Sequence, residues 1–581
     1  MAAKPSTSGL VNCVLTSDGT EVPSSIEIVS VATYKDINRI PYATISIVDG
    51  NVADQSFDGI ENDLLKPGKE LEIKAGFDSD SSTIFKGIIT QVGLKVTSKN
   101  SLLTVNCKDK SVKATADKKT KIFTEVKDSD IYSTIASDAG LSVDSDTTTF
   151  QHEQIVQYNA TDWDFILLRA EANGQVVIAD DGSLSIKKPS FSGSESLTLE
   201  FGTNIISFET SLNSEKQLAE VEVKSWDTGS MDALSSSGSS DAMDVGEISN
   251  SDLANIVSKK YSVNHGGLVS EDELKAWGDS IDLYHKMSKI QGVFTCFGTS
   301  DVSPGDIIEI KGASNRFSGK HYVTGVSHEI IGGGWKTKVQ IGFPSEMFHE
   351  KFRFQPQGAA GLMPAMNGLM CGKVTKIADD PNGEYRIQVQ VPVLGDDVNL
   401  WARYTVPDGG SSRGLVYYPE VDDEVVMGFL NNDPRYPVIL GSLFSGTNTP
   451  PAEPEATNAE KGFYSKKELK LLFNDEDETI TIETAGGNTI TVDNKGSSID
   501  ITDASGNEVK LSSSGVDISS ASNLNIQATG NIDINASGNL TLGGVNVEAA
   551  AQANFKASGN AGANLETSAI AVVKGSLVQI N

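Results

Sequence analysis

Two histidine–glutamate pairs, His152-Glu153 and His328-Glu329, contain the residue types that general acid–base catalysis uses. Both pairs fall in segments expected to be β-strands, and neighbouring residues of a strand point to opposite faces. Adjacency in the sequence therefore does not bring either pair together at one site. We expect neither pair to be catalytic, and we predict no catalytic residue elsewhere.

Candidate metal ligands and nucleophiles are sparse. The four cysteines lie far apart without a C-x-x-C pair, which indicates a reducing compartment at synthesis. Residues 379–383 (DDPNG) are rich in oxygen ligands but lack the spacing and closing glutamate of an EF-hand loop, so we predict a β-turn. Residues 411–413 (SSR) lack the glycines of a nucleophile elbow. No metal or cofactor is predicted.

The charge excludes some partners. With 47 Lys and Arg against 78 Asp and Glu in 581 residues, the net charge is −31, which argues against nucleic acid and anionic membranes. One basic run could face an acidic neighbour, and a solvated hairpin is the alternative. Its members are Lys108, Lys110, Lys113, Lys118, Lys119 and Lys121.

Short apolar alternations separated by Gly-rich and Asp-rich turns predict a mainly β protein. Residues 1–125 are expected to form a small antiparallel barrel or sandwich. Helices are predicted over 129–139, 161–174 and 271–290, the last two with capping boxes at Thr161/Asp164 and Ser270/Glu273. The N-terminus lacks the apolar core of a signal peptide, and no apolar run reaches membrane-spanning length.

Composition changes mark the domain boundaries. Residues 1–352 form the first predicted domain, with an exposed Ser-rich loop over 227–251. A Gly-rich and Pro-rich linker is predicted over 353–368, followed by a compact β unit over 369–446. A second linker is predicted over 447–478, and its first part holds three prolines.

The tail, residues 479–581, repeats an apolar-x-apolar unit followed by a turn, and from Asn523 the period is eight. This pattern is typical of a β-solenoid. The residues expected to form its core are Ile480, Ile482, Ile490, Val492, Ile499, Ile501, Val509, Leu511, Leu524, Ile526, Ile532, Ile534, Leu540 and Leu542.

Each octad supplies only two apolar side chains, so one strand and one turn cannot enclose a core. Either one chain coils on itself, or three chains wind around one axis and each supplies one face. The pattern alone does not choose between these two arrangements.

Residues 419–446 (PEVDDEVVMGFLNNDPRYPVILGSLFSG) carry a specific resemblance. A Pro-x-x-x-Asp-Glu-Val turn leads into a strand, and an Asn-x-Asp-Pro-x-x-Pro turn precedes Leu-Gly-Ser-Leu. This segment resembles the OB-fold of VgrG and phage central-spike proteins. Residues 157–174 and 304–330 resemble the base domain of the same family, and residues 1–125 match it by position and strand pattern.

The resemblance implies a tube-like β-barrel base domain with two barrels and a few helices, an OB-fold collar, and a C-terminal intertwined trimeric β-helix, or β-prism needle. Three base domains would form a pseudo-sixfold ring. Such proteins are homotrimeric spikes of contractile injection systems, either type VI secretion or phage-tail-like extracellular particles, and they puncture the target envelope mechanically.

The implied partners are a second and third copy of the chain, the hexameric inner-tube protein, baseplate proteins, a PAAR-type tip protein and, in some systems, effector cargo. The implied location is synthesis in the bacterial cytoplasm, then assembly into the apparatus and delivery outside the cell or into target cells. Residues expected to dock the tip protein are Val573, Leu577, Val578 and Ile580.

Some family members carry enzyme domains, and we expect none here. About 30 residues separate the OB-fold from the needle, fewer than a typical enzyme domain needs, and the sequence ends directly after the last repeat. Some phage spikes fold their own tip around a metal with a His-x-His pair, but all six histidines precede residue 350.

Two other classes of protein are alternatives. A β-solenoid adhesin or receptor-binding fibre predicts an aromatic or charged patch in the tail, which offers only Phe555. A solenoid polysaccharide lyase or hydrolase needs clustered carboxylates and a longer solenoid. The sequence therefore favours a non-enzymatic spike.

Overall fold

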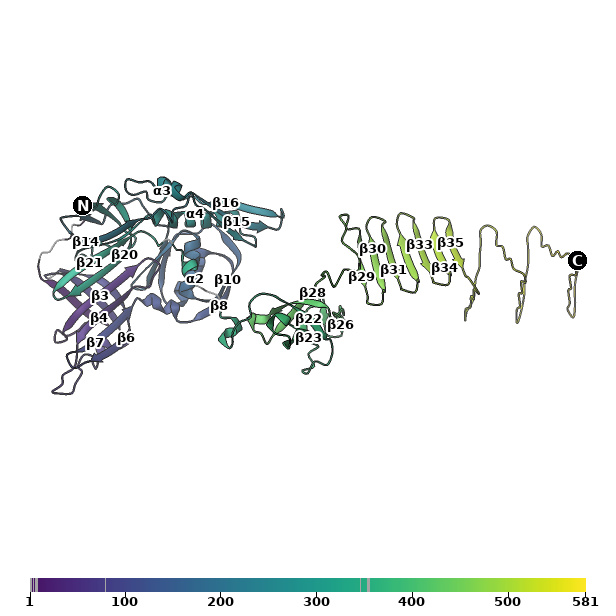
Figure 1. Ribbon diagram of the computed structural model, residues 1–581, viewed down its shortest axis with the longest axis horizontal. Helices are drawn as coiled ribbons and strands as arrows, with labels where there is room; N and C mark the ends of the chain where they lie inside the picture. Colours follow the sequence, from purple (N-terminus) through teal and green to yellow (C-terminus); the bar gives the residue numbers. More distant parts are fainter. Residues whose placement is uncertain are drawn as a thin grey trace. The chain divides into compact units, whose positions relative to one another are not determined.

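A computed structural model describes residues 3, 5, 9–78, 80–344, 346–352 and 356–580 (Figure 1). The chain divides into two compact units. The first is Met1–Asn367 with Asn431–Pro434, and the second is Gly368–Leu430 with Arg435–Asn581. Strands predominate in both units, so the prediction of a mainly β protein is confirmed. None of the described helices is long and apolar enough to cross a membrane.

The first unit is built on one large sheet, in which eight strands follow one another with alternating direction (Figure 1). In spatial order they are β14 (Ile205–Leu212), β18 (Ile290–Phe297), β21 (Gly334–Ile341), β20 (Gly319–Ile331), β3 (Ile28–Asp36), β4 (Tyr42–Val48), β7 (Ser101–Lys108) and β6 (Asp80–Val96). The sheet continues from β6 through β5 (Glu70–Phe77), β1 (Val11–Ser17) and β2 (Thr20–Glu21), while β19 (Ile307–Lys311) and β13 (Leu197–Glu200) extend it from β20.

Alternation along each strand explains the core of this sheet. Leu71, Ile73 and Ala75 of β5 are buried, and the residues between them are partly exposed. The strands before residue 125 share one buried core, contributed by β1, β3, β4, β5, β6 and β7, but they do not form a sheet of their own. Instead β3 pairs with β20, so the early strands join the late ones in a single sheet.

Five helices accompany this sheet in the described part of the chain: α1 (Asp128–Asp138), α2 (Asp162–Ala172), α3 (Asn250–Val257), α4 (Glu271–Met287) and α5 (Phe348–Lys351). The two predicted N-terminal caps are present. The hydroxyl of Thr161 accepts a hydrogen bond from the Asp164 amide at 3.1 Å, and that of Ser270 accepts one from the Glu273 amide at 3.2 Å. The last long helix ends at Met287, three residues before the predicted end.

Three smaller sheets complete the first unit. They are β8 (Lys118–Lys127) with β10 (Gln151–Thr161); β11 (Val176–Asp180) with β12 (Ser183–Lys187) and β9 (Ser142–Ser145); and β16 (Asp232–Ser237) with β15 (Glu220–Asp227) and β17 (Lys260–His265). The prediction of an exposed loop over 227–251 is wrong for β16. This strand pairs with β15 because Leu234 packs on the core beside α4.

A buried ionic network joins the helices. The Arg169 guanidinium on α2 donates to both carboxylate oxygens of Asp128 on α1, at 2.7 and 2.9 Å, and to Glu273 on α4 at 2.8 Å. Burial alone would raise the pKa of Asp128, but hydrogen bonds from His152 and Arg169 outweigh it and hold that pKa well below its usual range. The network therefore fixes three helix ends at one point.

The second unit begins with a closed five-stranded barrel. Its strands, in order around the barrel, are β22 (Met370–Lys376), β23 (Ile387–Gln390), β24 (Asn399–Tyr404), β28 (Pro437–Ser442) and β27 (Glu424–Phe429). Four completely buried side chains fill its interior: Val374, Val389, Val425 and Ile439. A small hairpin of β25 (Gly409–Gly410) and β26 (Arg413–Gly414) lies between β24 and β27 in the sequence.

A seven-stranded antiparallel meander follows the barrel (Figure 1). Its strands are β29 (Glu460–Tyr464), β30 (Lys470–Asn474), β31 (Thr479–Glu483), β32 (Thr489–Asp493), β33 (Ser498–Thr502), β34 (Glu508–Ser512) and β35 (Gly515–Ser519). The meander thus begins inside the predicted second linker, because Phe463 and Phe473 continue its apolar rows. From Ser520 to Ile580 the chain forms no strand.

Candidate functional site

One face of the meander is apolar from β30 to β35, and at its β29 end it carries Phe463 and Lys461. Residues directly opposite each other in a sheet share a face, and the pairs Ile480–Val492, Ile490–Ile501 and Ile499–Leu511 are of this kind. We call this surface the needle face. Its members are Phe463, Leu471, Phe473, Ile480, Ile482, Ile490, Val492, Ile499, Ile501, Val509, Leu511, Val516 and Ile518.

The needle face is uncovered within the chain. Seven of the eight predicted core residues that lie on it are 38–47% exposed, and Val509 is half-buried. The opposite face carries polar partners such as Thr491, Asp500 and Lys510, with an ion pair of 3.0 Å between the last two. Contiguous apolar surface of this kind marks a site of association.

The other predicted core residues lie beyond the sheet. Leu524, Ile526, Ile532, Ile534, Leu540 and Leu542 belong to no strand and are 51–72% exposed. The residues predicted to dock a tip protein, Val573, Leu577, Val578 and Ile580, are also exposed. Among the described residues, no second wall covers these side chains.

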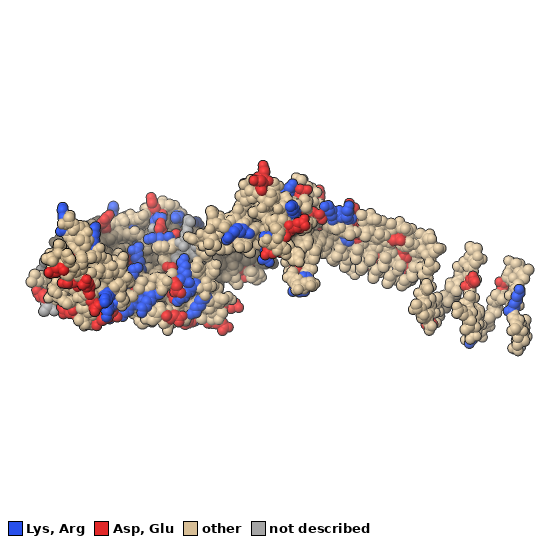
Figure 2. All heavy atoms as spheres, turned by 90° about the horizontal axis from the view of Figure 1, so that it is seen from below, with Lys and Arg blue, Asp and Glu red and all other residues tan. Residues whose placement is uncertain are grey.

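Half of the basic run is neutralised inside the first unit. Lys110 pairs with Glu70 at 2.8 Å, Lys119 with Asp162 at 2.5 Å and Lys121 with Asp138 at 3.1 Å. For Lys108, Lys113 and Lys118, no ion pair is formed with any residue that the structure describes. Figure 2 shows both signs of charge interspersed over the first unit and few charges along the meander.

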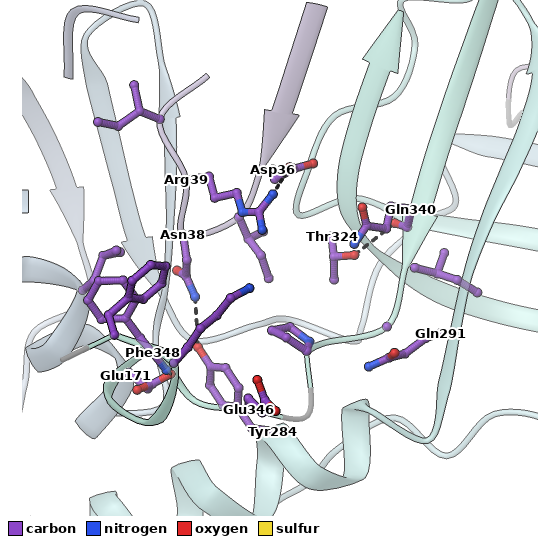
Figure 3. Close-up of a pocket in the computed structure, with 18 of the residues that line it drawn as sticks. Asp36, Asn38, Arg39, Glu171, Tyr284, Gln291, Thr324, Gln340, Glu346 and Phe348 are labelled. Atoms are coloured by element: carbon purple, nitrogen blue, oxygen red, sulfur yellow. Dashed lines mark hydrogen bonds and ion pairs between the residues drawn. The ribbon is translucent and has the colours of Figure 1, made fainter. Parts of the chain in front are cut away.

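The first unit also contains a cleft of about 1010 Å³ that sequence reasoning missed (Figure 3). Its walls are the ends of β3, β14, β18, β20 and β21 on one side and α2 and α5 on the other. Inside it, the Asn38 amide donates to the Tyr284 hydroxyl at 3.1 Å, and Arg39 lies 3.5 Å from Asp36. The lining residues come from distant segments, so no local motif announces the cleft.

Glu171 closes one end of this cleft. One of its carboxylate oxygens accepts a hydrogen bond from the Phe348 amide at 2.7 Å, and the other lies 3.3 Å from Nδ1 of His349. The hydrogen bond to Glu171 raises the pKa of His349 above its usual value. The carboxylate therefore holds α5 against α2.

The residues first considered for chemistry are structural. His152 is buried in the Arg169 network and His328 is buried beside Trp335, whereas Glu329 lies outside and faces Lys338. Asp380 accepts hydrogen bonds from the backbone of Asn382 and Glu384, which makes the predicted turn. Among the described residues, no three His, Cys, Asp or Glu side chains converge as metal ligands.

Two family models match the chain. Residues 7–332, more than half of the chain, match the Alg8 N-terminal domain. The chain belongs to the Alg8 N-terminal domain family. The second family model, the type VI secretion system/phage-baseplate injector OB domain, matches residues 370–444. These residues contain the closed barrel. The resemblance to VgrG and phage central-spike proteins is thereby confirmed.

Curated relatives agree with the resemblance to VgrG proteins. The chain is 29% identical to the actin cross-linking toxin VgrG1 of Vibrio cholerae over 130 residues. This alignment covers 21% of this chain and 11% of the relative. The chain is 20% identical over 201 residues to the type VI secretion system spike protein VgrG1a of Pseudomonas aeruginosa, which covers 32% of this chain and 30% of the relative. The matches thus span less than a third of either relative.

A solved structure also aligns with the family member. The 43 kDa tail protein of prophage MuSo2 from Shewanella oneidensis is 11% identical, and the alignment covers 58% of this chain and 99% of that one with a TM-score of 0.45. A TM-score of this size does not establish a common fold.

Proposed function

We propose that the chain is the subunit of a homotrimeric, non-enzymatic spike of a contractile injection system, either type VI secretion or a phage-tail-like extracellular particle. Residues 1–352 would form the base that docks on the hexameric inner tube and baseplate, and residues 369–446 the collar. The meander and the octads would form the needle. The needle would carry a PAAR-type tip protein on Val573, Leu577, Val578 and Ile580 and puncture the target envelope.

The observation that carries this proposal is the uncovered needle face. Its strands form a single-layered meander in which each strand pairs only with its sequence neighbours, and the residues that the structure describes supply no second wall. Burying one large aliphatic side chain is worth about 1.5–3 kcal/mol, and the face presents more than ten such side chains. Three copies that turn their needle faces inward would enclose a core with polar outer faces.

The octads support the same arrangement. Their apolar pairs continue the rows of the meander, but a single chain leaves them without hydrogen-bonded neighbours. Winding three chains together would give each octad two partner strands and bury its apolar pair. A prism built in this way has open strand edges only at its ends, and its continuous hydrogen bonding suits a part that must carry load.

The mass of the full-length protein in solution tests the proposal. We expect light scattering to give about three times the chain mass of 61.7 kDa. Ile490→Asp places a charge on the needle face and should lower the mass toward one chain. Thr491→Lys places a charge on the opposite face of the same strand, directly across from Asp500, and should leave the trimer intact. A stable monomer for the unchanged protein would overturn the proposal.

A further inference from the structure

Two turns along one edge of the meander share a five-residue sequence. Residues 484–488 (TAGGN) join β31 to β32, and residues 503–507 (DASGN) join β33 to β34. Both have alanine in the second position, glycine in the fourth and asparagine in the fifth. Because the strands alternate in direction, the two turns lie on the same edge of the sheet (Figure 1).

The two turns also have the same conformation. In the first, the Gly487 amide donates to the Thr484 carbonyl at 2.9 Å, and in the second the Gly506 amide donates to the Asp503 carbonyl at 3.1 Å. The two glycines have φ angles of 84° and 86°, in the left-handed region that favours glycine. The shared sequence therefore specifies one kind of turn, which the meander uses twice.

Each asparagine closes its own turn with its side-chain nitrogen. The side-chain amide of Asn488 donates to the Thr484 hydroxyl at 3.1 Å, and that of Asn507 donates to the Asp503 carboxylate at 2.7 Å. These bonds fix the two side chains and leave each amide oxygen available to accept a hydrogen bond from outside the turn.

That oxygen bonds the next turn along the edge. Oδ1 of Asn488 accepts the backbone amide of Ala504 at 3.3 Å, and Oδ1 of Asn507 accepts the backbone amide of Ala521 at 3.0 Å. Oδ1 of Asn507 also accepts the Ser520 hydroxyl at 2.9 Å. We call these bonds the asparagine ladder. Its second rung reaches residues that lie beyond β35, the last strand.

The same sequence recurs in the octads. Residues 527–531 (QATGN) and 535–539 (NASGN) repeat the alanine, glycine and asparagine positions, and the backbone bends at residues 529–530 and 537–538. Among the described residues, the side chains of Asn531 and Asn539 have no hydrogen-bond partner. The octads thus hold the asparagines of the ladder without its rungs.

We propose that Asn531 and Asn539 continue the asparagine ladder between copies of the chain. The side-chain oxygen of each would accept a hydrogen bond from the alanine amide of an octad turn, Ala528 or Ala536, in a neighbouring copy. This inference rests on the proposed trimer and deepens it, because it names residues that set the register of the three chains.

The octads need such a device because their apolar residues specify register only weakly. Side chains alternate between the two faces of a strand, so a slip of two residues keeps every apolar side chain facing inward. The same slip would move each asparagine about 6–7 Å from its alanine and break every rung. Ladders of asparagine side chains also add to the stability of stacked strands.

Amide hydrogen exchange of the full-length protein, read by mass spectrometry over residues 527–539, tests the ladder. The amides of Ala528 and Ala536 should be protected in the trimer. Asn531→Ala with Asn539→Ala should speed their exchange about tenfold, as expected when one hydrogen bond is lost. The control is Asn525→Ala with Thr541→Ala. These residues lie between the apolar residues of their octads and face away from the core, so their loss should leave both amides protected.

The outcomes separate the two proposals. A mass of three chains with unprotected alanine amides, or with equal effects of the two double variants, overturns the ladder alone. A mass of one chain overturns the proposed trimer and the ladder between copies with it. Should the Asn531→Ala/Asn539→Ala protein fail to assemble, the unchanged protein is compared with the monomeric Ile490→Asp variant. Slower exchange of Ala528 and Ala536 in the unchanged protein is expected, and equal exchange overturns the ladder.

Discussion

Ile490 and Ile501 lie directly opposite each other on β32 and β33, and they are 39% and 43% exposed. Most sheets of soluble proteins turn such a pair toward a core. Here the less exposed residues of the same strands are polar ones, including Thr489 and Thr491. The meander therefore has one apolar and one polar face, but none of the described residues forms a second layer that would bury the apolar face.

Removing apolar volume from the needle face should destabilise the assembled protein. We expect Ile501→Ala to cost about 2–5 kcal/mol per chain, the range for truncating a buried isoleucine, because assembly would bury this side chain. Denaturant unfolding at a concentration that supports the trimer measures the loss. Thr481→Ala, on the polar face of the meander, is the matched control and should change stability by less than about 0.5 kcal/mol. Equal, small losses for both variants would contradict a buried needle face.

Arg169→Ala should unfold the first unit much more readily. The change leaves Asp128 with only His152 and Asn173 as partners, and removing one member of a buried ion pair costs about 3–5 kcal/mol. Urea unfolding followed by tryptophan fluorescence reports mainly this unit, because four of the five tryptophans lie in it. Lys187→Ala breaks the exposed pair with Asp144 in the same unit and should cost less than about 1 kcal/mol. Similar losses for the two variants would show that the Arg169 network is not what holds the helices.

Local signals in the sequence predicted the local structure. The caps at Thr161 and Ser270, the alternating strands and the turn at residues 379–383 each depend on a few neighbouring residues, and all are present. The pairing of β3 with β20 depends on residues almost 300 positions apart, and nothing in either strand names its partner. For the same reason the Arg169 network and the cleft beside Tyr284 were not predicted.

The boundary of the meander shows another limit of local reasoning. β29 has the sequence EKGFY, which mixes charge, glycine and aromatic residues and carries little strand signal. It becomes a strand because β30 offers Leu471 opposite Phe463 and Phe473 opposite Lys461. The octads have a clear sequence periodicity, but residues 520–580 form no strand. A strand needs a hydrogen-bonded neighbour, and the described residues offer the octads none.

The contact between His349 and Glu171 should make the docking of α5 depend on pH. Because the folded pKa of His349 is raised, its protonated form stabilises docking fully below the unfolded value of 6.5, and this stabilisation is lost as pH rises through the folded pKa. Glu350 also faces the imidazole and acts in the same direction. We expect α5 amides to lose protection as pH rises above 6.5, after correction for intrinsic exchange. In His349→Gln this loss should disappear, and a loss that persists would assign it to another group.

The basic run should divide into lysines that stabilise the fold and lysines that are free to bind. Lys119 neutralises the buried carboxylate of Asp162, so Lys119→Met should lower the stability of the first unit by about 1–3 kcal/mol. Lys108→Glu with Lys113→Glu changes lysines without an ion pair among the described residues and should leave stability within about 0.5 kcal/mol. Thermal unfolding of the two variants beside the unchanged protein measures the difference.

If the basic run contacts the inner tube, the Lys108→Glu/Lys113→Glu protein should bind the tube protein of its own system at least tenfold more weakly at 0.1 M salt. The difference should shrink as salt is raised, because screening weakens exposed charge pairs beyond a Debye length of about 10 Å. A second variant, Lys95→Glu with Lys99→Glu at the end of β6, carries the same charge change on exposed lysines elsewhere on the unit and serves as the control. Equal loss of binding in both variants would indicate a general effect of net charge, and unchanged binding in the first would assign the run to a solvated hairpin.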